Sequence, residues 1–205
     1  MVSGDRSEPG VGVPRRVPGI LWCVVAAAVL LTGCTSNAVS TGSFVFVSPG
    51  GKTEFTYPAP ERQTIGNFTG TSVTAPEMTI QLADFPDTIL VLNFWASWCG
   101  PCRAETPGLE VVSDLHHDDG VQFLGINIDD DRQAGADFIS TYEVGFPSIF
   151  DPTSRTLLSI RGFPAVGKPH TIVLDRQHRV AHIFLGAVGA QELDEVVTAL
   201  VAEGA

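Results

Sequence analysis

Two stretches of the chain are almost continuously apolar, residues 88–95 and 121–128. Strands that are buried on both faces have this pattern, and they occur in parallel or mixed sheets covered by helices. A helix-like pattern lies between them, from Cys99 to about His116, and a second follows over about residues 133–142. The order strand, helix, strand, helix predicts an α/β fold with a parallel core.

The C-terminal part continues this alternation. Residues 146–152 begin a third block, with a short helix expected near residues 153–158. Residues 169–175 and 180–185 predict two strands joined by a hairpin turn over residues 176–179. Residues 190–201 predict a closing helix whose apolar face belongs to the core; that face contains Leu193, Val196, Val197, Leu200 and Val201. Ahead of all these elements, residues 75–82 predict an entering strand or hairpin.

The N-terminus has the organisation of an export signal. Arg15 and Arg16 precede an uncharged apolar run, residues 20–31, which is too short for a comfortable membrane span but suits the core of a signal peptide. The run ends in Leu31-Thr-Gly-Cys34, which resembles a bacterial lipobox, so Cys34 is expected to carry lipid and to become the first residue. The alternatives are an ordinary cleavage site and a short anchor helix with an incidental cysteine. We therefore expect a lipoprotein signal peptide at 1–33, a tether or N-terminal extension at 34–70 and the folded domain at 71–205.

The extension is rich in Gly, Ser, Thr and Pro, which is typical of a tether. Residues 43–47 nevertheless alternate as a strand does, and a turn signal follows them. The sequence leaves two interpretations open. The segment is either an extra edge strand or a spacer between lipid and domain.

Removal of residues 1–33 leaves 172 residues, enough for one domain with a core. Three arginines and two acidic residues lie in the removed part, so nine basic and 21 acidic side chains remain, a net charge of −12. Such a chain repels phosphate backbones, and nucleic acid is not expected as a partner. The acidity favours solubility beside a membrane.

The cysteines reduce to one close pair. Cys23 leaves with the signal peptide and Cys34 is assigned to lipid, so Cys99 and Cys102 remain in the domain. A disulfide between them would close a very small loop and add little stability. A zinc site would need two further ligands, and the histidines that follow the helix are not joined by a second cysteine pair. We expect no metal and a redox role for the pair.

The position of the pair favours thiol chemistry. Cys99 follows a buried strand and starts a helix, whose N–H groups and dipole stabilise a thiolate. Cys102 lies one turn inside and would resolve a mixed disulfide formed on Cys99. Gly100 and Pro101 fix the short spacing. After the second strand, the three aspartates at 129–131 are interpreted as a solvated helix N-terminus rather than a calcium site.

The motif Trp-Cys-Gly-Pro-Cys after a hydrophobic strand resembles thioredoxin, and "NFWASWCGPCRAETP" resembles the membrane-anchored TlpA/ResA type of thiol–disulfide oxidoreductase. The resemblance covers roughly residues 70–205. It implies a thioredoxin-like α/β fold: a central mixed β-sheet flanked by helices, with an N-terminal strand or hairpin extension. It also implies a central helix–strand insertion between Asp129 and Pro169.

The resemblance assigns roles around the dithiol. Pro169 matches the family's cis-proline, and Pro164 is a rival without the same sequel. The substrate groove is expected to contain Trp98, Gly100, Pro101, Lys168 and His170. His170 stands where the motif has a small hydroxyl residue. It would tune the thiols or contact substrate, or it is simply an exposed residue at the start of a strand.

Two further polar residues bear on proton transfer. Asn93 replaces the buried acid of thioredoxin. Glu105, one turn after Cys102, would accept a proton or raise the thiol pKa values through its charge. The alternative for Glu105 is an exposed helix residue facing solvent or Arg103. Trp95 is expected in the core.

The resemblance implies an enzyme without a cofactor that is extracytoplasmic and lipid-anchored to the outer face of the cell membrane. It would reduce disulfides in exported proteins, such as the Cys-x-x-Cys-His haem site of apocytochrome c, and a membrane thiol carrier would re-reduce it. One alternative is an oxidant that introduces disulfides, and another is a non-catalytic lipoprotein binding module. A peroxiredoxin shares the fold but carries its cysteine in a different motif.

Overall fold

The computed structural model describes residues 1, 4, 42–48, 50–164 and 167–204. The predicted signal peptide, the predicted lipobox and Cys34 lie outside the described residues. Within the described ranges, no helix has both the length and the apolar character that crossing a membrane requires.

The described chain forms eight strands, three α-helices and short 3-10 turns. The strands are β1 (Glu54–Thr56), β2 (Thr69–Ser72), β3 (Thr79–Gln81), β4 (Ile89–Trp95), β5 (Val121–Ile128), β6 (Ser148–Asp151), β7 (His170–Leu174) and β8 (Val180–Leu185). The helices are α2 (Gly100–Leu115), α3 (Arg132–Thr141) and α4 (Ala190–Glu203), and a 3-10 turn, η5, spans Arg155–Ser159. Strands β5 and β8 have the bounds that the sequence predicted, and β4 and α2 begin one residue later than predicted.

All eight strands belong to one mixed sheet with the order β1-β8-β7-β4-β5-β6-β2-β3. β4, β5 and β6 are parallel, whereas the pairs β4–β7, β7–β8, β8–β1, β6–β2 and β2–β3 are antiparallel. The predicted mixed α/β sheet is therefore confirmed. The central insertion is confirmed as well, because α3, β6 and η5 lie between Asp129 and Pro169.

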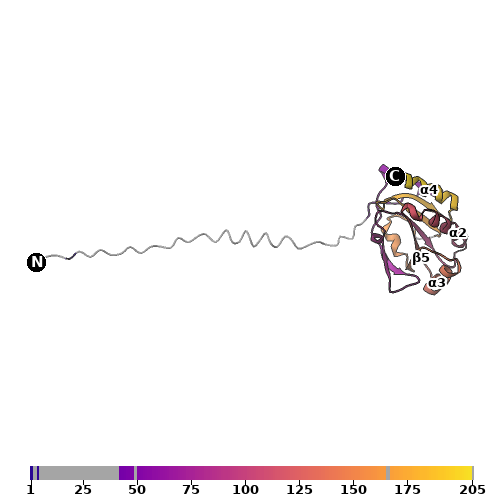
Figure 1. Cartoon of the computed structure of the whole chain (residues 1–205), viewed down its shortest axis with the longest axis horizontal. Helices are drawn as coiled ribbons and strands as arrows, with labels where there is room; N and C mark the ends of the chain where they lie inside the picture. Colours follow the sequence, from indigo (N-terminus) through magenta and orange to yellow (C-terminus); the bar gives the residue numbers. More distant parts are fainter. Residues whose placement is uncertain (2–3, 5–41, 49, 165–166, 205) are drawn as a thin grey trace. The chain divides into compact units, whose positions relative to one another are not determined.

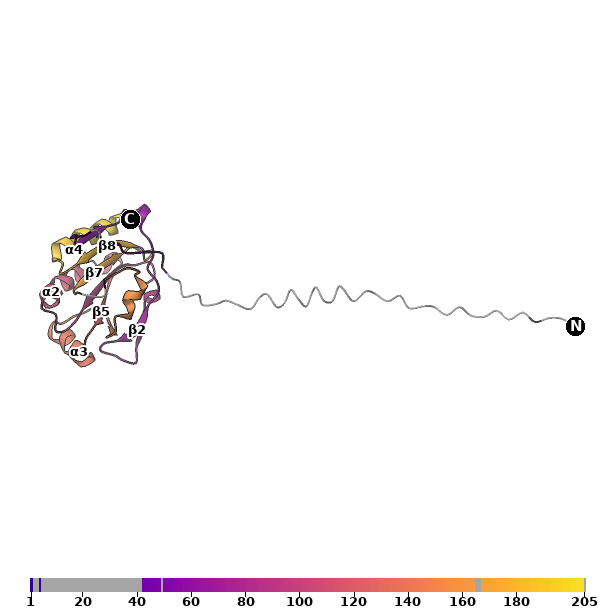
Figure 2. The ribbon, with the colours of Figure 1, turned by 180° about the vertical axis from the view of Figure 1, so that it is seen from behind.

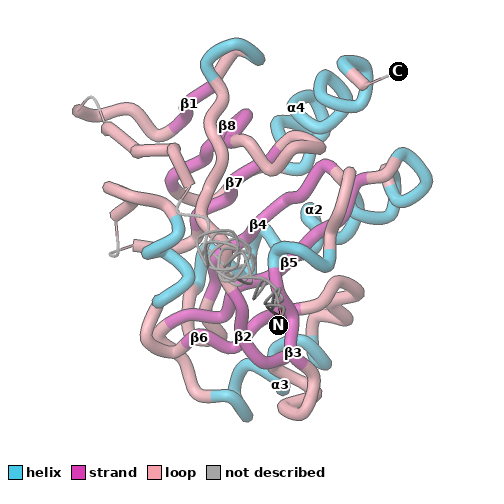
Figure 3. The backbone as a smooth tube through the Cα atoms, turned by 90° about the vertical axis from the view of Figure 1, so that its left-hand side faces the viewer, coloured by secondary structure: helices cyan, strands magenta, loops and turns pink. Residues whose placement is uncertain are grey.

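Alternate residues of β4 face two apolar clusters on opposite sides of the sheet. Ile89 and Val91 pack in a cluster with residues of α2 and α4, and these two helices lie on the same side of the sheet (Figures 1 and 3). Leu90, Leu92 and Phe94 belong to the other cluster, which contains residues of the N-terminal segment and of η5. Both faces of the strand are covered, which is why its sequence is continuously apolar.

The N-terminal segment packs on the sheet, but residues 43–47 do not form the edge strand that was one of the two interpretations. Phe44 and Phe46 are buried while Val45 and Val47 are exposed, so the side chains do alternate. The N–H of Phe44 donates to the carbonyl of Thr64, whereas that of Phe46 donates to a loop around residue 161. Val45 makes an isolated bridge with Arg161, so the segment forms no ladder. The edge strand beside β8 is instead β1 (Figure 3), and β8 in turn lies beside β7 (Figure 2).

The sheet register brings three chain segments together at one end of the central strands. Trp95 at the end of β4 lies beside Asn127 near the end of the parallel strand β5. Phe94 pairs with His170, the first residue of the antiparallel strand β7. The loops that follow β4 and β5 and the loop that precedes β7 therefore meet, and Cys99 lies in the first of them.

Candidate functional site

Cys99 and Cys102 form a disulfide at the start of α2, with their Cα atoms 5.3 Å apart. Cys99 is the N-cap of the helix, and its sulfur accepts the N–H of Cys102 at 3.2 Å. Pro101 lies in the first turn, where its missing N–H leaves no helical bond unmade. Both cysteines are buried, with exposed fractions of 3% for Cys99 and 1% for Cys102. Position on the helix therefore distinguishes the two cysteines better than burial does.

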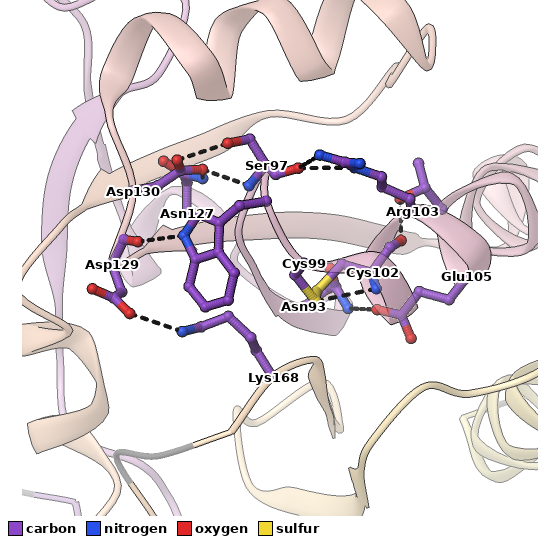
Figure 4. The surroundings of a disulfide bond; sticks show 12 residues. Asn93, Ser97, Cys99, Cys102, Arg103, Glu105, Asn127, Asp129, Asp130 and Lys168 are labelled. Atoms are coloured by element: carbon purple, nitrogen blue, oxygen red, sulfur yellow. Dashed lines mark hydrogen bonds and ion pairs between the residues drawn. A yellow bond between two sulfur atoms is a disulfide. The ribbon is translucent and has the colours of Figure 1, made fainter.

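The two residues before Cys99 are fastened to the end of β5. The carboxylate of Asp130 accepts the backbone N–H of Ser97 at 2.6 Å and its hydroxyl at 2.7 Å (Figure 4). The indole N–H of Trp98 donates to the carbonyl of Asp129 at 2.8 Å. These contacts hold the loop that leads into the disulfide.

The exposed Trp98 and the half-buried Lys168 form a rim near the disulfide (Figure 4). Trp98 has an exposed fraction of 56%. The ammonium group of Lys168 lies 4.3 Å from the centre of the indole ring, in cation–π geometry, and 3.2 Å from a carboxylate oxygen of Asp129. The structure thus brings together two residues predicted for the groove, and it adds Asp129, for which the sequence predicted no contact with them.

The acidic triplet does not act as one solvated helix terminus. Only Asp131 fits that prediction, because its carboxylate caps α3 by accepting the N–H groups of Gln133 and Ala134. The carboxylate of Asp130 binds the loop before Cys99 instead, whereas that of Asp129 is exposed and pairs with Lys168. The prediction was wrong for Asp130 because its contact depends on β4 and β5 ending side by side. Three consecutive acids after a buried strand would have been the only sequence signal for it.

Glu105 is buried on the inner side of α2. One carboxylate oxygen accepts from the side-chain amide of Asn93 at 2.8 Å, and the other accepts from the N–H of Val188 at 3.1 Å. Burial raises the pKa of Glu105 to about 7, although both hydrogen bonds act in the opposite direction. The alternative of an exposed Glu105 is wrong, and Arg103 bonds to the carbonyl of Ser97 rather than to Glu105.

Asn93 joins Glu105 to strand β7. Its amide group donates both to Glu105 and, at 3.1 Å, to the hydroxyl of Thr171. Figure 4 shows Asn93 and Glu105 next to the disulfide. The amide holds the carboxyl group in place without adding a second charge.

The peptide bond between Lys168 and Pro169 is cis, and the bond before the rival Pro164 is not. His170 follows as the first residue of β7, and its ring lies edge-on to Phe163 at 5.3 Å between centres. The exposed interpretation of His170 is wrong, because its exposed fraction is 6%. Gly100 and Pro101, between the two cysteines in the sequence, are exposed.

No metal centre accompanies the disulfide in the ranges that the structure describes. There, no group of three or more His, Cys, Asp or Glu side chains is arranged to hold a metal ion. The chemistry available at this site is that of two sulfurs, a helix N-terminus and one buried carboxyl group.

Comparison with known proteins places this site in a family. Residues 60–200 match the Redoxin family. The chain is 26% identical over 116 residues to the thiol-disulfide oxidoreductase ResA of Bacillus thuringiensis, an alignment that covers 57% of this chain and 65% of the relative. The chain thus spans slightly less than two thirds of the length of this curated relative.

Two solved structures are similar over nearly their whole length. A secreted thiol-disulfide isomerase from Corynebacterium glutamicum has a TM-score of 0.76 and 38% identity, covering 78% of this chain and 99% of that one. A DsbF homologue from Corynebacterium diphtheriae has a TM-score of 0.73 and 41% identity, covering 77% and 99%. The chain therefore belongs to the Redoxin family, as a thioredoxin-fold member of the TlpA/ResA type.

Proposed function

We propose that the protein is an extracytoplasmic thiol–disulfide oxidoreductase that reduces disulfides in exported proteins through Cys99 and Cys102. The observation that carries this proposal is the arrangement of the pair. A disulfide begins a helix, one sulfur accepts a helix N–H, and a buried carboxyl group with a pKa of about 7 lies one turn away.

In the reduced protein, the Cys99 thiolate attacks one sulfur of the substrate disulfide. A mixed disulfide forms, and the first substrate thiolate leaves and takes a proton. The Cys102 thiolate then attacks the Cys99 sulfur, so the Cys99–Cys102 disulfide forms and the second substrate thiolate leaves. Two electrons pass from the protein to the substrate. A dithiol of a membrane carrier returns them in the next cycle.

Glu105 is proposed to take the proton that Cys102 loses before its attack. A carboxyl group with a pKa of about 7 is divided between its two forms near neutral pH, so it can both accept and return a proton. Asn93 and the N–H of Val188 keep it in place through the cycle. The substrate chain would bind in a groove formed by Trp98, Lys168, Pro169 and the exposed Gly100–Pro101 turn. The buried His170 would pack beneath this groove, inside the protein.

The cellular setting is also a proposal. The relatives include a secreted enzyme, and the N-terminal sequence pattern supports export with lipid attachment at Cys34. A reductase placed there could keep the Cys-x-x-Cys-His thiols of apocytochrome c free for haem attachment. The isomerase named among the relatives keeps a second direction open, in which the protein introduces or rearranges disulfides.

The test is the reduction potential of the Cys99–Cys102 pair, together with electron transfer to an oxidised Cys-x-x-Cys-His peptide. We expect a potential close to that of thioredoxin, about −270 mV, and stoichiometric reduction of the peptide by the reduced protein. A Cys102→Ser variant should stop at a mixed disulfide on Cys99 and trap the partner. A potential near about −120 mV, as in strong disulfide oxidants, would overturn the reductase direction and support the second one.

A further inference from the structure

The carboxylate of Asp130 accepts four hydrogen bonds next to the loop between β4 and α2, which leads to Cys99. It accepts the N–H and the hydroxyl of Ser97 at 2.6 and 2.7 Å, the side-chain amide of Asn127 at 2.7 Å and the N–H of Asp131 at 2.9 Å. Asn127 belongs to β5, so the carboxylate is anchored to the sheet as well as to the loop. Four hydrogen bonds of this kind hold the carboxylate in one position.

Ser97 is held from its other side by the helix. Its carbonyl oxygen accepts two donors of the Arg103 guanidinium, at 2.9 and 2.6 Å (Figure 4). Arg103 lies in the second turn of α2, four residues after Cys99. The loop between β4 and α2 is therefore fixed to β5 by Asp130 and to α2 by Arg103.

We propose that Asp130 is a positioning residue of the redox centre, which fixes the loop before Cys99 so that the start of α2 can stabilise the Cys99 thiolate. The inference deepens the proposed function, on which it rests for the role of Cys99. As the N-cap, Cys99 must keep its non-helical backbone conformation for its sulfur to face the N–H of Cys102. The backbone of Ser97 is two residues away, and Asp130 holds it.

The charge of Asp130 and its positioning effect act on the Cys99 thiol with opposite sign. A nearby negative charge disfavours a thiolate and raises the thiol pKa, whereas correct placement at the helix start lowers it. The charged or titratable groups around the disulfide are Asp129 and Asp130 after β5, Lys168 and His170 at the start of β7, and Arg103 and Glu105 on α2. A variant that keeps the charge of Asp130 but displaces its carboxylate therefore separates the two effects.

The Asp130→Asn variant keeps the size of the side chain and replaces one acceptor oxygen by a donor. In one amide orientation that donor faces the N–H of Ser97 and the side-chain amide of Asn127. In the other it faces the hydroxyl of Ser97 and the N–H of Asp131, so hydrogen bonds to the side chain at position 130 are lost in either case. We expect the Cys99 pKa to rise and the rate of Cys99 alkylation at a pH below this pKa to fall about three- to tenfold, since only the thiolate reacts. The equilibrium with glutathione should shift toward the disulfide form. Asp130→Glu keeps the charge but displaces the carboxylate. It should also raise the Cys99 pKa and lower the alkylation rate.

Asp131→Ala is the matched control. It removes the cap of α3 but leaves the N–H that Asp130 accepts, and its carboxylate has no bond to Ser97. It should lower the thermal midpoint while the alkylation rate stays as in the unaltered protein. Should Asp130→Asn prove too unstable to purify, Ser97→Ala removes one of the two bonds to that residue and should give a smaller fall in rate.

The measurement is the pH profile of iodoacetamide alkylation at Cys99 in the reduced full-length chain, read by mass spectrometry. An unchanged or lower Cys99 pKa in the Asp130 variants and in Ser97→Ala would overturn the proposal. A fall in the Cys99 alkylation rate of Asp131→Ala would also overturn it, because loss of stability alone would then explain the effect. The assay needs no substrate protein, so a failure to reduce the Cys-x-x-Cys-His peptide would refute the proposed function and leave this inference standing.

Discussion

Glu105 is the residue in the site whose environment departs most from that of a free side chain. It lies on the buried side of α2 and accepts hydrogen bonds from one side-chain amide and one backbone N–H. Among the described residues, no cationic side chain bonds to its carboxylate. A buried carboxylate without an opposite charge favours its neutral form. Its proton equilibrium is therefore tied to folding as well as to redox chemistry.

We predict that the stability of the oxidised protein falls as the pH rises through about 7 and that Glu105 causes much of this fall. Its pKa is raised from 4.5 to about 7, so its contribution is fully present below about 4.5 and is lost as the pH passes the folded value. The loss amounts to at most about 3.5 kcal/mol, since one pKa unit corresponds to about 1.4 kcal/mol. Guanidinium unfolding at about pH 5 and about pH 8 measures it.

In Glu105→Gln this part of the pH dependence should disappear. The exposed Glu77 gives the control, because Glu77→Gln should leave the fall with pH unchanged. Equal pH dependence in the Glu105 variant and the unaltered protein would show that the buried carboxyl group is not the one that titrates.

At the scale of elements, His116 joins the end of α2 to α4. Its Nδ1 lies 2.9 Å from a carboxylate oxygen of Asp119, and its Nε2 lies 2.7 Å from one of Asp194. Both ring nitrogens must donate to satisfy two carboxylates, which favours the imidazolium. Burial acts to lower the pKa of His116, but the hydrogen bonds to Asp194 and Asp119 outweigh it, so the pKa is raised. The zinc alternative concerned the histidines that follow the helix, and His116, the first of them, instead clamps α2 to α4.

We predict that His116→Ala destabilises the protein by about 1–2 kcal/mol at about pH 5.5, as expected for lost hydrogen bonds to charged groups. Because the folded pKa is raised, the contribution is fully present below the unfolded pKa of 6.5 and is lost as the pH rises through the folded value. Variant and parent should therefore converge at alkaline pH. Urea unfolding curves across this range provide the check.

His117 is the natural control for this experiment, being a neighbouring histidine with an exposed side chain. His117→Ala should change stability by less than about 0.5 kcal/mol at any pH. Glu105 titrates with the same sign, so only the difference between each variant and the parent assigns a share to one residue. A gap between His116→Ala and the parent that persists at alkaline pH would contradict the clamp.

For the molecule as a whole, the N-terminal segment contributes to the core. Phe46 packs against Phe55 at 5.1 Å and against Phe163 at 5.2 Å between ring centres, and Phe163 in turn contacts His170. The guanidinium of Arg62 pairs with Glu203 near the C-terminus at 2.6 Å. These contacts favour the interpretation of residues 43–70 as part of the folded unit over that of a spacer.

We predict that Phe46→Ala costs about 3–5 kcal/mol of stability, the usual range for a buried phenylalanine. Val47 is the matched neighbour, with an exposed fraction of 70% against 4% for Phe46. Val47→Ala should change stability by less than about 0.5 kcal/mol. Denaturant midpoints of the two variants decide between the interpretations, because a mere tether would make them equal.

The sequence by itself determined the parts of this protein that depend on local pattern. Two apolar runs predicted β4 and β5, and the cysteine spacing after such a run predicted a redox pair at the start of a helix. Local pattern reports periodicity, caps and breaks, and these follow from residues within a turn or two of one another. Resemblance to a known family, in addition, identified Glu105 and Pro169.

Only the tertiary structure decided which distant side chains meet. Ser97 and Asp130 are 33 positions apart, and Lys168 and Asp129 are 39 apart. They come together because β4 and β5 are parallel in register and β7 runs against β4. The burial of Glu105 and His170 likewise depends on elements that pack over them from elsewhere in the chain. A sequence pattern carries no information on that packing, because the residues responsible lie outside the window in which periodicity is read.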